Sequence, residues 1–208
     1  MSKQKHFTLK ILTAILLCAW VNVVWAHHRD SVTVKNVEFV KNCNQWEPQV
    51  LFKAALHGGA VFAEKGCFTF VILDPLQLEA FYAGKFDPAH ATDGIINAAA
   101  YKIHFTHANP QTEVVGQEKI QGYHNYYLGK DSKRWATHVP VYHEVAYKEL
   151  YRGIDLLLTQ EDSHLKYEFT VAPGASPNQI TLDYEGVQNL SVVKGDLVIT
   201  TAVMQIWN

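Results

Sequence analysis

Short apolar runs that alternate with polar residues recur along the chain, and Gly, Pro, Asn or Asp separates most runs from the next. Side chains of a strand point alternately to the two faces of a sheet, so such runs fit half-buried strands. Tyr101, Ile103 and Phe105, each followed by a polar residue, give the clearest example. The regular spacing of short strands and turn signals predicts an all-β, β-sandwich-like fold.

Turn residues mark where the expected strands begin and end. His57-Gly58-Gly59 predicts a tight hairpin, because glycine accepts a positive φ without steric cost. Pro140 favours an edge strand or a break, because proline cannot donate to a sheet ladder. The expected strands are 32–40, 49–56, 59–64, 67–73, 95–107, 113–115, 122–129, 135–147, 153–159, 165–171, 180–184, 190–193 and 197–201.

One segment, 74–82, predicts a short helix near residues 75–82. Asp74 is a good N-cap, and Pro75 stands at a position where a helix tolerates proline. Leu76, Leu78 and Phe81 are expected to face inward from it.

Residues 1–26 have the features of a cleavable secretory signal. Lys3, Lys5 and Lys10 supply a positive start, and 11–24 is almost wholly apolar. Small or medium residues stand where a signal peptidase reads, so cleavage is expected after Ala26. An uncleaved anchor is the alternative, although the run is short for a membrane span.

The rest of the chain, 27–208, is expected to form a single β-rich domain outside the cytoplasm, secreted or at the cell surface. The formal net charge of the 208 residues is -2, which gives no footprint for nucleic acid. No second apolar run approaches the roughly 20 residues of a transmembrane helix. The chain stops within an apolar run at Trp207 and Asn208, which suggests a domain truncated at its C-terminus.

Two cysteines, Cys43 and Cys67, remain after the signal. Export leads to an oxidising compartment, where these residues could form a Cys43–Cys67 disulfide. Two buried free thiols are the alternative, because sequence does not give the separation of the two Cα atoms.

Histidines could bind metal. Cleavage after Ala26 would leave His27 first, and a terminal amine with an imidazole suits copper, as in copper-dependent polysaccharide oxygenases. A polar tail with exposed histidines is the plainer interpretation. The pairs His104/His107 and His138/His143 are separated by odd numbers of residues, so regular strands would turn their side chains to opposite faces.

The remaining candidates are aromatic and acidic. Trp135, Tyr126 and Tyr127 belong to an aromatic-rich stretch that either builds the core or stacks on sugars. Asp155 stands in an apolar run, where it accepts backbone N–H groups or pairs with an arginine at a strand start. The alternatives are a catalytic base with a raised pKa, or an acid/base pair with Glu168 that acts on sugars. Nucleophile-elbow, phosphate-loop and Cys-x-x-Cys motifs are absent from the sequence.

A combination of motifs, none specific alone, carries a family resemblance. The segments are 39–46, 58–62, 122–129 (GYHNYYLG), 135–140, 145–155, 165–169 and 171–177 (VAPGASP). Together they resemble the uncharacterised N-terminal domain of large secreted bacterial proteins, common in Bacteroidetes. In that family the domain precedes SBBP (β-propeller-type) repeats, PKD or other Ig-like domains, and often a type IX sorting domain.

The resemblance covers about 37–201 and implies an extracellular or cell-surface β module without assigned catalytic residues. Cys43 and Cys67 depart from the family pattern, as does the early end of the chain. We expect a non-catalytic structural or interaction module of a larger adhesin-like protein, without a cofactor. Its partners would be downstream domains, surface partners or glycans.

Two other functions stay open at this point. The first is carbohydrate binding or processing through Trp135, Tyr126, Tyr127 and Asp155. The second and weaker one is a copper enzyme that uses His27.

Overall fold

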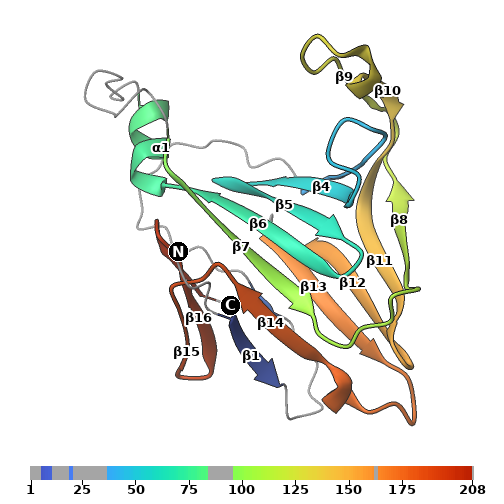
Figure 1. Cartoon of the computed structure of the whole chain (residues 1–208), viewed down its shortest axis with the longest axis vertical. Helices are drawn as coiled ribbons and strands as arrows, with labels where there is room; N and C mark the ends of the chain where they lie inside the picture. Colours follow the sequence, from blue (N-terminus) through green and yellow to red (C-terminus); the bar gives the residue numbers. More distant parts are fainter. Residues whose placement is uncertain (1–5, 11–18, 21–36, 84–95, 162–163, 208) are drawn as a thin grey trace.

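The computed structural model describes residues 6–10, 19–20, 37–83, 96–161 and 164–207 (Figure 1). Most of the strands that it describes lie in one antiparallel sheet that curls into a half-barrel. Its strand order is β1 (His6–Lys10), β14 (Thr181–Glu185), β7 (Ala98–Phe105), β6 (Cys67–Leu73), β5 (Gly59–Glu64), β4 (Val50–Leu56), β3 (Phe39–Lys41), β11 (Val141–Tyr151), β12 (Ile154–Glu161), β13 (His164–Val171) and β2 (Ala19–Trp20).

One further strand, β8 (Glu113–Lys119), pairs with β11 beside that path. Two small sheets stand apart from the main one: β9 (His124–Tyr126) with β10 (Ala136–Val139), and β15 (Asn189–Val193), β16 (Asp196–Thr200) and β17 (Gln205–Trp207). The helical elements described are α1 (Pro75–Tyr82) and two 3-10 turns, η2 (Ser132–Arg134) and η3 (Pro177–Gln179).

The curl of the sheet depends on β11. Tyr142 pairs with Phe39 of β3 and also with Lys119 of β8, so these two strands use opposite edges of β11. Val145 pairs with Leu158 of β12 and with Gly116 of β8. One edge of β11 therefore pairs with β3 near the start of the strand and with β12 further along. This change of partner along a single edge curves the sheet back toward itself.

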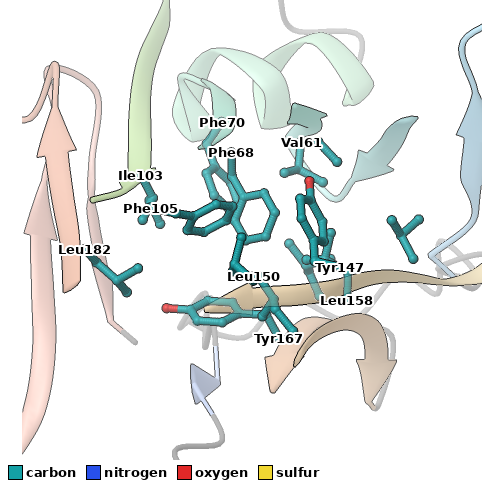
Figure 2. Packing of buried hydrophobic residues seen from close by; sticks show 14 of the residues in the cluster. Val61, Phe68, Phe70, Ile103, Phe105, Tyr147, Leu150, Leu158, Tyr167 and Leu182 are labelled. Carbon is teal, nitrogen blue, oxygen red and sulfur yellow. The ribbon is translucent and has the colours of Figure 1, made fainter. Parts of the chain in front are cut away.

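The inner face of the curled sheet forms the main core. Alternate residues of each strand point inward, as the period-two pattern predicts. Phe68 of β6 packs edge-on against Phe105 of β7 at 4.7 Å between ring centroids and against Tyr147 of β11 at 5.8 Å (Figure 2). It also lies 6.1 Å from the ring of Tyr167 on β13. The sandwich-like packing thus comes from the two halves of one sheet facing each other.

The predicted all-β class with one short helix is confirmed. Asp74 caps α1 by accepting hydrogen bonds from the backbone N–H groups of Leu76 and Gln77. The expectation that Leu76 and Phe81 face inward is wrong, because they are 76% and 53% exposed and only Leu78 of this helix is buried.

The expected hairpin at His57-Gly58 forms between β4 and β5, and Pro140 separates β10 from β11. The expected strand 122–129 is much shorter, since only β9 forms there. Part of the expected strand 32–40 lies outside the described residues, and so does the predicted cleavage site after Ala26. The predicted signal includes β1 and β2, whose backbones pair with β14 and β13.

Buried tyrosines should make the fold sensitive to alkali. Burial raises the pKa of Tyr151 to about 12, and it also raises the pKa values of Tyr101, Tyr147 and Tyr184. In the unfolded chain tyrosine ionises near pH 10, so above that pH the unfolded state binds fewer protons than the folded state. The free energy of unfolding should therefore fall steadily from about pH 10 upward. Urea titrations at stepped pH, read with tyrosinate absorbance, test this, and an unchanged midpoint would contradict it.

Candidate functional site

Among the residues that the structure describes, the most exposed aromatic side chains outside α1 lie on residues 122–139, which we call the arm. The arm consists of β9, η2, β10 and their connections, and it lies beyond the end of β11 that begins at Val141 (Figure 1). Ala136 pairs with Tyr126 and Val139 pairs with His124, with an irregularity between the two pairs. The arm is therefore a small two-stranded structure attached to one end of the half-barrel.

A second, smaller core joins the arm to the main sheet. Val40, Ala136, Val139 and Val141 are buried in it. Trp46, Ile120 and Tyr126 pack against these residues, with the rings of Tyr126 and Trp46 edge to face at 5.4 Å. Tyr126, one of the predicted ligand-binding residues, therefore lies at the base of the arm and not on its open surface.

The loop 42–49 supports this base through two amide side chains. Asn42 donates from Nδ2 to the carbonyl oxygens of Trp46, Glu47 and Val50, and its Oδ1 accepts from the backbone N–H of Trp46. Gln45 is fully buried, where it accepts from the backbone N–H of Cys43 at 2.6 Å and donates to the carbonyl of Lys41 at 2.7 Å.

Asn42 and Gln45 thus hold Trp46 in place. Sequence reasoning assigned them no role, because a loop amide has no periodicity that reveals its partners. The amide side chain of Asn44 extends the support by donating to the carbonyl oxygen of Lys133 in η2 at 3.2 Å.

The tip of the arm presents two aromatic rings. Tyr127 and Trp135 are 61% and 46% exposed, and their rings meet at 5.6 Å and 86°. The indole N–H of Trp135 donates to the carbonyl of Gly129 at 3.3 Å. Asp131 accepts from the backbone N–H of Lys133 and so caps the η2 turn that leads into Trp135. These bonds fix the indole position, yet leave much of the ring open.

A second aromatic pair lies nearer β9. Tyr123 is 53% exposed, and its ring lies 4.3 Å from that of His138 at 34°. His138 has a positive φ of 56°, and its backbone N–H donates to Oδ1 of Asn125 at 3.0 Å. The arm therefore carries two exposed aromatic pairs, each held by hydrogen bonds to the arm itself.

Asp155 does not join this site. Its Oδ1 accepts from the backbone N–H of Glu149 at 2.7 Å, and its Oδ2 pairs with Lys148 at 3.2 Å. Glu149 has a positive φ of 51°, in the irregular stretch where β11 turns toward β12. Along β11 this turn is about 25 Å from Val141, beside the arm. Asp155 therefore accepts a backbone N–H, as one of its sequence interpretations stated, and its cationic partner is a lysine, whereas that interpretation named an arginine.

Glu168 lies on β13, opposite Leu157, on the same sheet face as Asp155. It pairs with Lys166 at 2.9 Å, and Lys166 also pairs with Glu161 at 2.8 Å. Asp155 and Glu168 are thus each paired with a lysine on the outer face of the sheet. This arrangement favours ion pairing over acid/base chemistry.

No cluster of three or more metal-ligating side chains occurs among the residues that the structure describes. His27 lies outside those residues, so copper binding there stays a prediction. His104 Nε2 lies within hydrogen-bond distance of Oε2 of Glu185, at 2.7 Å, and this contact joins β7 to β14.

Cys43 and Cys67 are free thiols, with Cys43 exposed and Cys67 buried. Cys43 follows β3 and Cys67 begins β6, while β4 and β5 lie between them in the sheet. Three strand spacings are roughly 14 Å, and a disulfide spans at most about 7 Å between Cα atoms. The structure therefore contains no Cys43–Cys67 bridge.

The two thiols should differ in reactivity. Burial raises the pKa of the Cys67 thiol to about 11, with the Glu64 carboxylate adding to the shift, so almost no thiolate exists at neutral pH. We expect iodoacetamide to modify Cys43 in the folded protein and Cys67 only after unfolding. Peptide mass mapping distinguishes the two, and fast labelling of Cys67 under native conditions would contradict its burial.

Fold and site together define an all-β domain that carries an arm with exposed aromatic residues at one end of its main sheet. The chain belongs to the family described as a domain of unknown function, DUF7948, whose model matches residues 39–208. No curated protein and no solved structure matches the chain. Among the described helices, none has the length and apolar character needed to cross a membrane.

Proposed function

We propose that this chain is a non-catalytic, exported β domain that engages a partner through the arm. The observation that carries the proposal is the open position of Trp135 and Tyr127, whose rings contact each other. The indole N–H of Trp135 donates to Gly129, and Asn44 of the loop 42–49 donates to Lys133 in the η2 turn before Trp135. Exposed aromatic rings held rigidly are typical of contact surfaces, because they bury large area at little cost in conformational entropy. Asp155 serves a turn, which supports a role without catalysis.

The setting of this domain is part of the proposal. The signal-like segment 1–26 supports secretion or display at the cell surface. The resemblance stated above supports a parent protein of the adhesin-like kind, with SBBP repeats, PKD domains or a type IX sorting domain downstream. The half-barrel would then serve as a rigid support that projects the arm toward a surface partner.

Carbohydrate recognition is the more specific candidate for the contact. The 86° angle between the rings of Tyr127 and Trp135 forms a corner, in which a sugar stacked on one ring lies beside the edge of the other. Stacking of this kind uses the apolar face of a sugar and the π-face of an aromatic ring.

A double substitution at the tip, Tyr127→Ala with Trp135→Ala, tests the proposal. Because both rings are exposed, the free energy of unfolding should change by less than about 1 kcal/mol. Binding of the labelled chain to arrays of polysaccharides and surface proteins should be lost.

The matched control is Leu76→Ala with Tyr82→Ala on α1, where both side chains are more than 70% exposed. This control should bind as the wild type does. Binding that survives the arm substitutions, or that is lost equally in the α1 control, would contradict the proposal.

A further inference from the structure

The tip of the arm is cationic as well as aromatic. Residues 122–139 contain three cationic side chains, Lys130, Lys133 and Arg134, against one carboxylate, Asp131. All four are exposed. The whole chain, in contrast, carries a net charge of -2. The arm is therefore a local concentration of positive charge on a slightly acidic protein.

Two of these cations are available for a ligand. Among the described residues, no carboxylate lies within ion-pair distance of the ammonium groups of Lys130 and Lys133. Oδ1 of Asp131 accepts the backbone N–H of Lys133 in capping η2. Arg134 holds the carboxylate of Glu47 at 3.8 Å, in a pair whose side chains are 50% and 68% exposed. A carboxylate is thus already bound at this edge of the tip, where an incoming one could replace it.

The cations and the rings belong to one short stretch of chain. Lys130 directly follows Gly129, whose carbonyl accepts the indole N–H of Trp135. Lys133 lies within the η2 turn that ends at Trp135. The indole and the two exposed lysines therefore belong to the same turn of the arm.

This combination fits an acidic sugar better than the other partners. Each uronic acid residue offers an apolar ring face for stacking and a carboxylate for ion pairing. A protein interface normally covers about 800 Å² per partner around an apolar centre, whereas the exposed large apolar residues of the arm are Tyr123, Tyr127, Leu128 and Trp135. Nucleic acid needs a broader basic surface than one with three cations.

We propose that the tip of the arm binds an acidic polysaccharide built from uronic acids. The rings of Trp135 and Tyr127 stack on the sugars, and Lys130, Lys133 and Arg134 bind their carboxylates. This inference rests on the proposed function in one respect, namely that the arm is the contact surface.

Titration of the full chain with polygalacturonate tests the inference, with uncharged dextran as the comparison polysaccharide. Polygalacturonate should bind, dextran should bind at least about tenfold more weakly, and added salt should weaken the polygalacturonate complex because exposed charges are screened. Lys130→Gln with Lys133→Gln should lower the affinity about tenfold, and Trp135→Ala should lower it by a similar factor.

Lys65→Gln with Lys194→Gln is the matched control, because it removes the same charge from two exposed lysines outside the arm. Its affinity should stay within about twofold of the wild type. If this control lowers the affinity for polygalacturonate as much as the arm lysine changes do, the overall charge of the protein and not the arm governs binding, and the inference is overturned.

Other results separate this inference from the proposed function. Equal binding of dextran and polygalacturonate, sensitive to Trp135→Ala but not to the lysine changes, overturns the acidic ligand and leaves the arm as the contact surface. The absence of any binding to polygalacturonate also overturns it. A polygalacturonate complex that survives every arm substitution overturns the inference and the proposed function together.

Discussion

Phe68→Ala is expected to lower the free energy of unfolding by about 3–5 kcal/mol, the range for truncating a fully buried aromatic residue. Phe68 is 1% exposed, and its ring contacts aromatic residues of both halves of the curled sheet. Its removal would leave a cavity between Phe105, Tyr147 and Tyr167 that their rings cannot readily fill (Figure 2).

Chemical denaturation measures this change, and Phe81→Ala on α1 is the control with the same substitution at a side chain that is 53% exposed. The control should lose less than about 1 kcal/mol. Phe68→Leu keeps most of the volume and should cost less than the alanine variant, which keeps the test informative if Phe68→Ala does not fold. Equal effects of Phe68→Ala and Phe81→Ala would mean that the two halves of the sheet do not meet at this ring.

Strand positions were predictable because a strand produces a local alternation of apolar and polar residues in the sequence. Ile103 and Phe105 point inward and Lys102 and His104 outward, as their alternation indicates. The curl was not predictable in the same way. It depends on Tyr142 and Val145 of β11, which pair with different strands along one edge. The partner of Tyr142 is Phe39 of β3, far away in the sequence.

At the candidate site and at the helix, too, contacts between residues close in sequence were predictable, and contacts between distant segments were not. Asp74 capped its helix as expected, since the cap and its partners lie within three residues. Trp135 and Tyr126 belong to one aromatic stretch, but Tyr126 packs on Trp46 from another part of the chain and Trp135 has no such cover. Sequence therefore identified the aromatic stretch and could not tell which rings stay open.

Gly59→Ala is expected to have an effect of similar size, about 3 kcal/mol or more, for a backbone reason. Gly59 opens β5 and pairs with Ile72 of β6, and a Cβ at this position would overlap the carbonyl oxygen of Val71. The overlapping atom belongs to the backbone of a neighbouring strand, so relief requires β5 and β6 to separate locally.

Gly66→Ala is the matched control, because it makes the same change in the turn between β5 and β6, where no atom lies within 4 Å of the added Cβ. The stability of the control should stay within about 1 kcal/mol of the wild type. Thermal melting of both variants decides the matter. If Gly59→Ala melts with its control, the close approach of β5 to β6 at Val71 is relieved without cost. If it melts far below, the packing of β5 against β6 requires glycine at position 59, while the positive φ of the preceding turn falls on Gly58.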